Sequence, residues 1–193
     1  MSNFYSGVEV NAEESLKRAE LILAGIKGGA KKAVGSALTR AASAGKTEVK
    51  KIITQEYNIS AGLFSSETQN INHYEKSSSG DITVAFGFRG SPIPLIKFSS
   101  SVGRGGKVQV QVKKSGSKQA LDHAFIANVG SHTGIFERET PERFPIRQLY
   151  GPATTQMIYS NETVLDKMEE KMGTVFDQRI DHEINAILNG FRR

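Results

Sequence analysis

Apolar positions in the N-terminal part of the chain recur at steps of three and four residues, which predicts helices. The run AEESLKRAELILAGI, residues 12–26, follows Asn11, and acids fill its first turn, where the helix dipole favours negative charge. We expect Asn11 to be the N-cap residue of this helix. Its expected core positions are Leu16, Ala19, Leu23 and Ile26, and Gly28 and Gly29 interrupt it.

A second helical run covers residues 30–57, so that residues 11–57 are predicted to be helical. The middle of this run is built of Ala, Gly and Ser, which would let another backbone approach closely. Packing of the long helix across a sheet is the use of these small residues that we favour. The apolar positions expected on one side of the helix are Val34, Leu38, Ala41, Val49, Ile52 and Ile53.

The pattern changes after Asn58, and residues 68–139 are predicted to be mostly β-structure after a short helical turn in SAGLFSS, residues 60–66. Residues 71–89 indicate two strands joined by a Ser-Gly turn. KVQVQVKK, residues 107–114, alternates apolar and polar side chains, and residues 123–139 indicate a hairpin with a Gly-Ser-His turn. The positions expected to face inward are Ile82, Val84, Phe86, Phe88, Val108, Val110 and Val112.

The segment between these strands, residues 90–107, is predicted to be irregular. Its prolines cannot donate hydrogen bonds to a central ladder, and its Ser/Gly-rich second half is typical of a flexible loop.

Residues 161–191 predict one long helix, because apolar side chains keep helical spacing over the whole segment. Its core positions are Leu165, Met168, Met172, Phe176, Ile180, Ile184, Ile187 and Phe191. The order of the elements predicts an α+β fold in which long N-terminal and C-terminal helices pack on an antiparallel sheet. We expect a single domain over residues 1–193, with residues 140–160 as the connector before the last helix.

Composition narrows the class of protein. The chain has 193 residues, a hydrophobic fraction of 38%, 19 glycines, no tryptophan and no cysteine, which predicts a thin core and excludes disulfides, thiolate zinc sites and cysteine nucleophiles. A basic, then apolar leader and a run of about 18 apolar residues are both missing from the sequence. We therefore expect a soluble, unsecreted chain without contact to a membrane.

The net charge of +5 is distributed unevenly. Nine basic residues and two acids lie between Lys17 and Lys51, no acid occurs between Ile82 and Leu121, and acids dominate the C-terminal helix. Such asymmetry suits contact with a polyanion or charge-complementary self-association, and an unevenly charged solvated surface is the alternative.

Candidates for chemistry are sparse. The four histidines form no two-His ligand pattern, and we predict no metal and no cofactor. In DHAFIANVGSHTGIFE, the residues Asp122, His123, His132 and Glu137 would suit a metal nuclease if the hairpin brought them to one end. Polar residues gather at strand ends routinely, so we favour the structural interpretation and predict no catalytic residue.

The stretch GRGGK, residues 103–107, only partly resembles a phosphate-binding loop. Ser101 stands where the first Gly of the motif is required, and Val108 replaces the Ser or Thr that would hold magnesium. A basic segment that contacts phosphates without base specificity fits better, and the loop has no aromatic platform for stacking. The candidate DNA-facing residues are Arg104, Lys107, Lys113, Lys114 and Lys118.

Three stretches carry a resemblance that covers residues 15–190: GSPIPLIKF (90–98), AFIANVGSHTGIFERE (124–139) and FPIRQLYGPATTQM (144–157). In this order, between a basic helical N-terminus and an acidic helix, they resemble the prophage minor tail protein Z family. The resemblance implies a tail completion protein of long-tailed bacteriophages: a structural virion protein at the head-proximal end of the tail, needed for infectious particles and for placement of the DNA end. It implies no enzymatic activity.

The connector has a physical interpretation. Pro145 and Pro152 restrict the backbone, Gly151 provides a joint, and Pro152 suits the first turn of a new helix. A ring subunit needs a fixed direction for the helix that follows, because a heterologous interface closes only when every subunit repeats one angle. The candidate connector and interface residues are Pro92, Pro94, Leu95, Pro145, Ile146, Leu149, Tyr150, Gly151 and Pro152, of which Ile146, Leu149 and Tyr150 are expected to anchor in the core.

The first hypothesis is therefore a homo-oligomeric ring, expected to be a hexamer, in the virion tail and in the host cytoplasm during assembly. Its subunit contacts are expected between the acidic last helix and the basic N-terminal helices. Its partners would be tail tube, terminator and neck proteins, with genomic DNA passing along residues 82–121 in the lumen. The alternatives are a nonspecific double-stranded DNA-binding protein acting off the virion and a hydrolytic metalloprotein.

Overall fold

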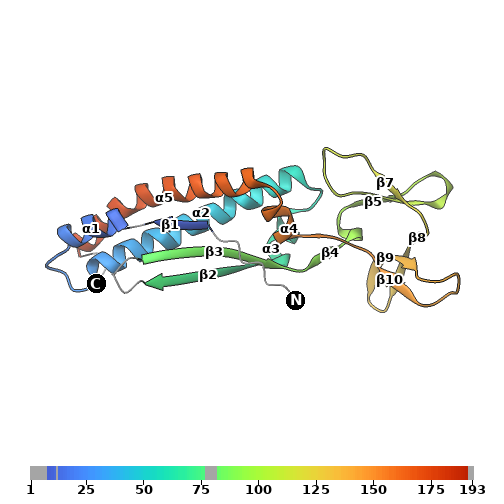
Figure 1. The fold of residues 1–193 in the computed structure, drawn as a ribbon, viewed down its shortest axis with the longest axis horizontal. Helices are drawn as coiled ribbons and strands as arrows, with labels where there is room; N and C mark the ends of the chain where they lie inside the picture. Colours follow the sequence, from blue (N-terminus) through green and yellow to red (C-terminus); the bar gives the residue numbers. More distant parts are fainter. Residues whose placement is uncertain (1–7, 12, 77–81, 191–193) are drawn as a thin grey trace. The chain divides into compact units, whose positions relative to one another are not determined.

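The computed structural model describes residues 8–11, 13–76 and 82–190, and the side chains of residues 13–69 and 87–190. It confirms the α+β class, because long helices are combined with small antiparallel sheets (Figure 1). The chain divides into two compact units. Unit 1 comprises residues 1–49, 70–88 and 161–193, and unit 2 comprises residues 50–69 and 89–160. The expectation of one domain over residues 1–193 stays a prediction.

Unit 1 combines helices with a three-stranded sheet in the order β1-β3-β2. Its helices are α1 (Glu13–Ile22), α2 (Gly29–Glu56) and α5 (Glu162–Leu188). Only the part of α2 up to Val49 belongs to this unit. Its strands are β1 (Val8–Asn11), β2 (Thr68–Lys76) and β3 (Ile82–Gly90), whose last residues belong to unit 2. Strand β1 is antiparallel to β3 and is also in contact with α5.

Helix α1 forms as predicted, but its ends differ. Asn11 is the last residue of β1 and pairs with Thr83 of β3, and its side chain, on which the predicted cap depends, lies outside what the structure describes. The helix ends at Ile22, before the two glycines, and a tight turn follows in which the Ile26 amide donates to the Leu23 carbonyl. Ile26 is consequently exposed, whereas Leu16, Ala19 and Leu23 are buried as expected.

The small residues of α2 receive side chains from α5. A Cβ atom built on Gly45 would lie 2.5 Å from Met172 Cγ and 3.2 Å from Met168 Cγ. The close neighbour at this point is therefore a helix, in place of the sheet that the sequence analysis favoured. Val34, Leu38, Ala41, Val49 and Ile53 are buried as predicted, and Ile52 is half-buried.

Helix α5 confirms the clearest sequence prediction. Met168, Met172, Phe176, Ile180, Ile184 and Ile187 are all buried. Val164 is buried one position before the half-buried Leu165, and Phe191 lies outside the described residues. Glu183 is one of the acids of this helix, but only 2% of it is accessible, so it does not contribute to an acidic surface.

Unit 2 is built from short strands and short helices. The helical elements are α3 (Ala61–Glu67), the 3₁₀ turns η1 (Leu95–Lys97) and η2 (Arg104–Gly106), and α4 (Thr154–Tyr159). Three sheets have the orders β5-β6-β7, β10-β9-β8 and β11-β4. Their strands are β4 (Pro92–Pro94), β5 (Ser99–Val102), β6 (Val108–Gln111), β7 (Gln119–Leu121), β8 (Ala124–Val129), β9 (His132–Arg138), β10 (Ile146–Gln148) and β11 (Tyr150–Ala153).

Several local predictions hold in unit 2. Helix α3 begins where expected, with Ser60 Oγ accepting from the Leu63 amide as its N-cap, and β8 and β9 form the predicted hairpin. Val108, Val110 and Phe88 are buried. Val112 is only half-buried, because β6 ends at Gln111. The side chains at Ile82, Val84 and Phe86, like the Ser-Gly turn at 77–81, lie outside what the structure describes.

The Ser-rich stretch after the proline motif was predicted to be a flexible loop, and this is wrong for Ser99–Val102. These residues form β5, which pairs with β6 from Ser99↔Gln111 to Val102↔Val108. Serine is not among the residues enriched in strands, so pairing with β6, more than the local sequence, accounts for this conformation. Among the described helices, none is both long and apolar enough to cross a membrane.

Candidate functional site

The two proline motifs that carry the family resemblance meet in space. Strand β4 contains the first motif and β11 contains the second, and they pair antiparallel with Tyr150 opposite Pro94 and Ala153 opposite Pro92. The Leu95 amide donates to the Leu149 carbonyl, which extends the contact by one residue on each strand. Sequence reasoning had treated the motifs separately, and the structure joins them into one two-stranded connector.

Gly151 is a point of close packing in this connector. A Cβ atom on Gly151 would lie 2.6 Å from Phe98 Cε2 and 3.2 Å from Leu95 Cδ2. Its φ angle lies outside the left-handed region, so close packing and not backbone freedom requires glycine here. Gly151 was predicted to be a flexible joint, but in the structure its role is to make room for the neighbouring side chains.

Two further predictions about the connector are wrong. Pro152 does not begin a helix, because it lies in β11 and α4 starts at Thr154, where Gln156 Oε1 accepts from the Ala153 amide. Tyr150 does not anchor in the core, since 53% of it is exposed. Ile146 and Leu149 are half-buried, and the Phe144–Pro145 peptide bond is cis.

The five candidate DNA-facing cations are exposed, but four of them contact other groups of unit 2. Lys107 Nζ lies 2.7 Å from Asp122 Oδ1, and Lys118 Nζ lies 2.9 Å from Ser101 Oγ. Lys114 Nζ donates to the Thr54 carbonyl at 2.8 Å. Within the described part of the chain, Arg104 makes no hydrogen bond or ion pair, so it is the most available of the five.

The contacts of Lys107 and of Lys113 shift pKa values. The hydrogen bond between Lys107 and Asp122 raises the pKa of the ammonium group and lowers that of the carboxyl group. The Tyr57 phenol and the Glu56 carboxylate raise the pKa of Lys113, whose Nζ lies 5.3 Å from the centre of the Tyr57 ring. These lysines therefore stay charged at neutral pH, but part of their charge is neutralised within the chain.

The metal-nuclease candidates do not converge. In the β8–β9 hairpin, Glu137 pairs opposite Ala124 at one end, and His132 pairs opposite Val129 at the turn. Five residues of strand between His132 and Glu137 correspond to roughly 16 Å. Glu137 also binds Arg147 at 2.9 Å, and the described residues contain no group of three potential metal ligands.

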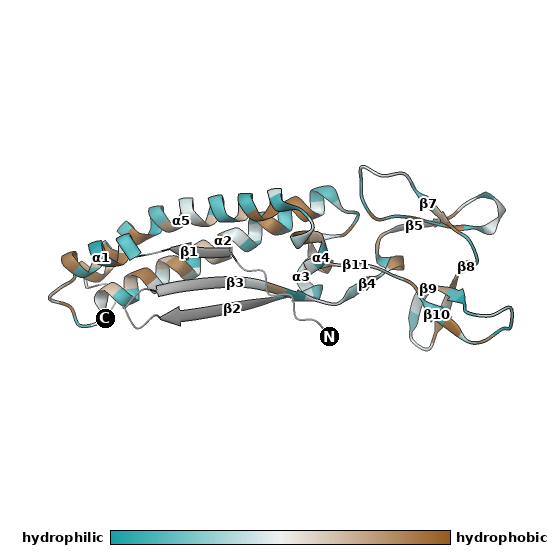
Figure 2. Cartoon of the chain, in the orientation of Figure 1, coloured by the Kyte–Doolittle hydropathy of each residue, from teal (hydrophilic) through white to brown (hydrophobic). Residues whose placement is uncertain are grey.

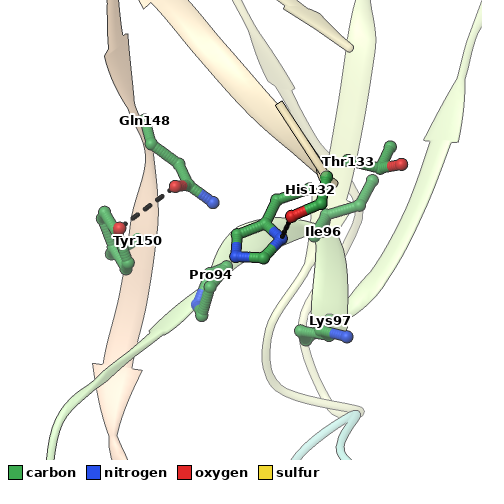
Figure 3. Close-up of a pocket in the computed structure, with 8 residues that line it drawn as sticks. Pro94, Ile96, Lys97, His132, Thr133, Gln148 and Tyr150 are labelled. Carbon is green, nitrogen blue, oxygen red and sulfur yellow. Dashed lines mark hydrogen bonds between the residues drawn. The ribbon is translucent and has the colours of Figure 1, made fainter. Parts of the chain in front are cut away.

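A cleft of about 510 Å³ lies in unit 2 where the connector meets the turn of the hairpin (Figure 3). Its lining comes from three segments, β4 with η1, the β8–β9 turn with the start of β9, and β10 with β11. The lining residues are Pro94, Ile96, Lys97, Ser131, His132, Thr133, Gln148 and Tyr150. Sequence reasoning missed Lys97, Gln148 and His132 as neighbours, because long-range strand pairing brings them together.

Hydrogen bonds hold the side chains of the cleft in place. The Tyr150 hydroxyl donates to Gln148 Oε1 at 3.1 Å, and Ser131 Oγ shares a hydrogen bond with His132 Nδ1 at 3.1 Å (Figure 3). Gly134 makes room for Gln148, since a Cβ atom there would lie 3.0 Å from Gln148 Nε2. Thr133 points away from His132, and its hydroxyl donates to Asn128 Oδ1 at 2.6 Å.

Comparisons with known proteins identify no relative: no protein-family model, no curated protein and no solved structure matches the chain.

Proposed function

We propose that this chain is a structural subunit of the tail of a long-tailed bacteriophage, a tail completion or head–tail joining protein that forms a ring at the head-proximal end. In this proposal it has no enzymatic activity and helps to position the end of the genomic DNA that passes through the lumen. The observation that carries the proposal is the pairing of the two proline motifs, with Tyr150 opposite Pro94. The most specific stretches of the sequence thus form one structural element.

The packing of the connector agrees with a structural role. Ala153, Thr154, Met157 and Ile158 are buried directly after β11, so α4 is anchored as soon as the connector ends. Gly151 is in contact with Phe98 and Leu95, which fixes β11 against the segment after β4. A connector restrained in this way repeats one geometry in every copy, as a closed ring requires.

The exposed surface of α5 supports self-association through charge. Glu162, Asp166 and Glu170 follow one another at steps of four residues, and Asp177 and Asp181 repeat the spacing. Like charges four residues apart destabilise a helix by roughly 0.2–0.5 kcal/mol per pair. Of these five acids, only Asp181 has an ion-pair partner among the described residues, Arg18 of α1. Figure 2 shows hydrophilic residues recurring along α5.

The complementary surface lies on α2. Within unit 1, Arg40 and Lys46 carry positive charge on this helix, and no ion pair to them occurs among the described residues. On the same stretch of helix, Thr39, Ser43 and Thr47 each donate their hydroxyl to the carbonyl four residues earlier, at 2.9 to 3.0 Å. Because these donors are already satisfied, another helix can cover them at little cost. We assign the subunit contact to α5 of one copy and α2 of the next.

Imaging of virions, or of tails assembled with the gene intact, tests the proposal. We expect density for this chain as a ring, with sixfold symmetry, at the head-proximal end of the tail, beside tail tube, terminator and neck proteins. Lys107 and Lys113 should face the lumen. Absence of the chain from mature particles would overturn the placement.

The second candidate function is nonspecific binding to double-stranded DNA away from the virion. The exposed cations of unit 2, above all Arg104, favour it. The isolated chain would then bind duplex DNA with an affinity that falls steeply as salt rises, because counterions are released on binding. No binding at low salt would eliminate this candidate.

A further inference from the structure

We propose that the cleft beside Tyr150 binds a nucleotide unit of unpaired DNA, with the base stacked on the tyrosine ring and the phosphate held by Lys97 and His132. The inference goes beyond the proposed ring, and it holds or fails on the isolated chain, whatever its place in a virion. It rests on the charge, the shape and the fixed side chains of the cleft.

The charge of the lining selects an anion. Lys97 is the only residue with a fixed charge among the eight that line the cleft, and the lining contains no Asp or Glu. Lys97 is exposed, and within the described part of the chain its ammonium group makes no hydrogen bond or ion pair. The absence of carboxylates disfavours a divalent cation, which usually binds to at least one carboxylate.

His132 adds a second group for the anion. Its Nδ1 shares a hydrogen bond with Ser131 Oγ, which leaves Nε2 for a ligand. In Figure 3 the imidazole lies between Gln148 on one side and the Ile96–Lys97 segment on the other. A phosphate group in the cleft can accept from Nε2–H through one oxygen and from Lys97 Nζ through another once the flexible lysine side chain turns toward it, and contacts of this kind bind phosphate.

Tyr150 supplies a platform on the other side of the cleft. Its ring is half-exposed, although its hydroxyl is held by Gln148. An aromatic ring fixed in this way can stack on any unpaired base without first losing side-chain freedom. Gln148 has an amide nitrogen beside the ring, which can donate to the edge of a stacked base.

The combination distinguishes a nucleotide from other anions. A volume of about 510 Å³ lies within the range of small-ligand clefts, roughly 300 to 1,000 Å³. Free phosphate would use Lys97 and His132 but leave the ring uncovered. An acidic peptide would likewise satisfy only the cation, and a base paired in duplex DNA has no face free for Tyr150. An unpaired nucleotide uses both ends of the cleft.

Fluorescence anisotropy of a labelled single-stranded thymidine octamer tests the assignment on the full-length chain. We expect Tyr150→Ala to weaken binding about fivefold or more, the range of one lost stacking contact, and Tyr150→Phe to stay within about twofold. Lys97→Gln should also weaken binding. The matched control is Lys51→Gln, an exposed lysine of unit 2 outside both the lining and the candidate DNA-facing set, which should have a smaller effect.

Competition experiments separate the possible ligands. Thymidine monophosphate should displace the octamer at lower concentration than inorganic phosphate or thymidine alone. The proposal is overturned if duplex DNA of equal length competes equally well, if polyglutamate competes better than the nucleotide, or if Lys51→Gln and Lys97→Gln weaken binding equally. No binding by the wild-type chain at low salt also overturns it. Circular dichroism of each variant checks folding. Tyr150→Ala tests whether the ring is needed for binding, and Tyr150→Phe tests whether the hydroxyl is needed.

Discussion

Gly45 of α2 lies beneath Met172 of α5, so close that a Cβ atom on the glycine would be 2.5 Å from Met172 Cγ. The contact joins the middle of the two longest helices of the chain at a buried position. Only a residue without a side chain allows it. The contact therefore limits how closely the two helices can pack at this point.

Replacement of Gly45 by Ala should destabilise the protein by about 1–3 kcal/mol, because an added methyl group in a filled core forces neighbouring atoms to move. The control is Gly35→Ala in the same helix, where a Cβ atom would meet nothing within 4 Å. Alanine there should stabilise by roughly 0.5–1 kcal/mol through helix propensity. Urea unfolding of both variants measures the difference, and equal effects would contradict the packing described for Gly45.

Gly151→Ala should destabilise unit 2 by about 1–3 kcal/mol, since the new Cβ atom would overlap the buried Phe98 ring. Gly116→Ala is the control in the same unit, because its Cβ atom would meet only ordinary van der Waals contact at 3.5 Å. Hydrogen exchange of the β4–β11 amides reports the effect locally. Unchanged protection in Gly151→Ala would show that the connector tolerates a side chain at this point.

Charge reversal tests the interface between copies. Asp166→Lys with Glu170→Lys on α5 should prevent ring formation, as should Arg40→Glu with Lys46→Glu on α2, because each variant places like charges opposite each other. A mixture of the two variants should assemble again, since every α5 then meets a complementary α2. Sedimentation and infectivity of phage carrying one or both variants measure this outcome. If each variant forms rings on its own, or if the mixture does not form rings, the interface between copies lies elsewhere.

The pH dependence of the Lys107–Asp122 pair has a definite sign. The hydrogen bond from Lys107 lowers the pKa of Asp122 in the folded protein, so its contribution to stability is present above the unfolded pKa of about 3.9 and disappears as pH falls through the folded pKa. Lys107→Met should therefore raise the pKa of the Asp122 carboxyl group, and Lys118→Met should leave it unchanged. NMR titration of the carboxyl carbon measures both, and an unshifted Asp122 in Lys107→Met would contradict the contact.

Periodic segments of the sequence were the ones that predicted structure well. Met168, Met172, Phe176, Ile180 and Ile184 follow one helical row, and a local pattern is enough to place them. The hairpin between β8 and β9 is equally local. Strand β1 was not predicted, because it forms only through pairing with β3, a distant part of the chain.

The candidate site was harder to predict, because it depends on pairing between distant segments. Pro94 and Tyr150 become neighbours only through the β4–β11 ladder, and Ser99–Val102 become a strand only through β6. The cleft adds His132 from a third segment. The exposed lysines were correctly placed at the surface, but Asp122, one residue beyond the acid-free stretch, turned out to bind Lys107.

The division of the chain into units sets an order of completion during synthesis. The sequence passes between the units four times, and unit 2 receives its last residue at Ser160, whereas unit 1 receives α5 only afterwards. A ribosome therefore delivers all of unit 2 before the helix that fills the core of unit 1. A premature stop between residues 160 and 168 removes Met168 and Met172, the partners of Gly45, so such a truncation of α5 produces a chain with one complete unit and one open hydrophobic face.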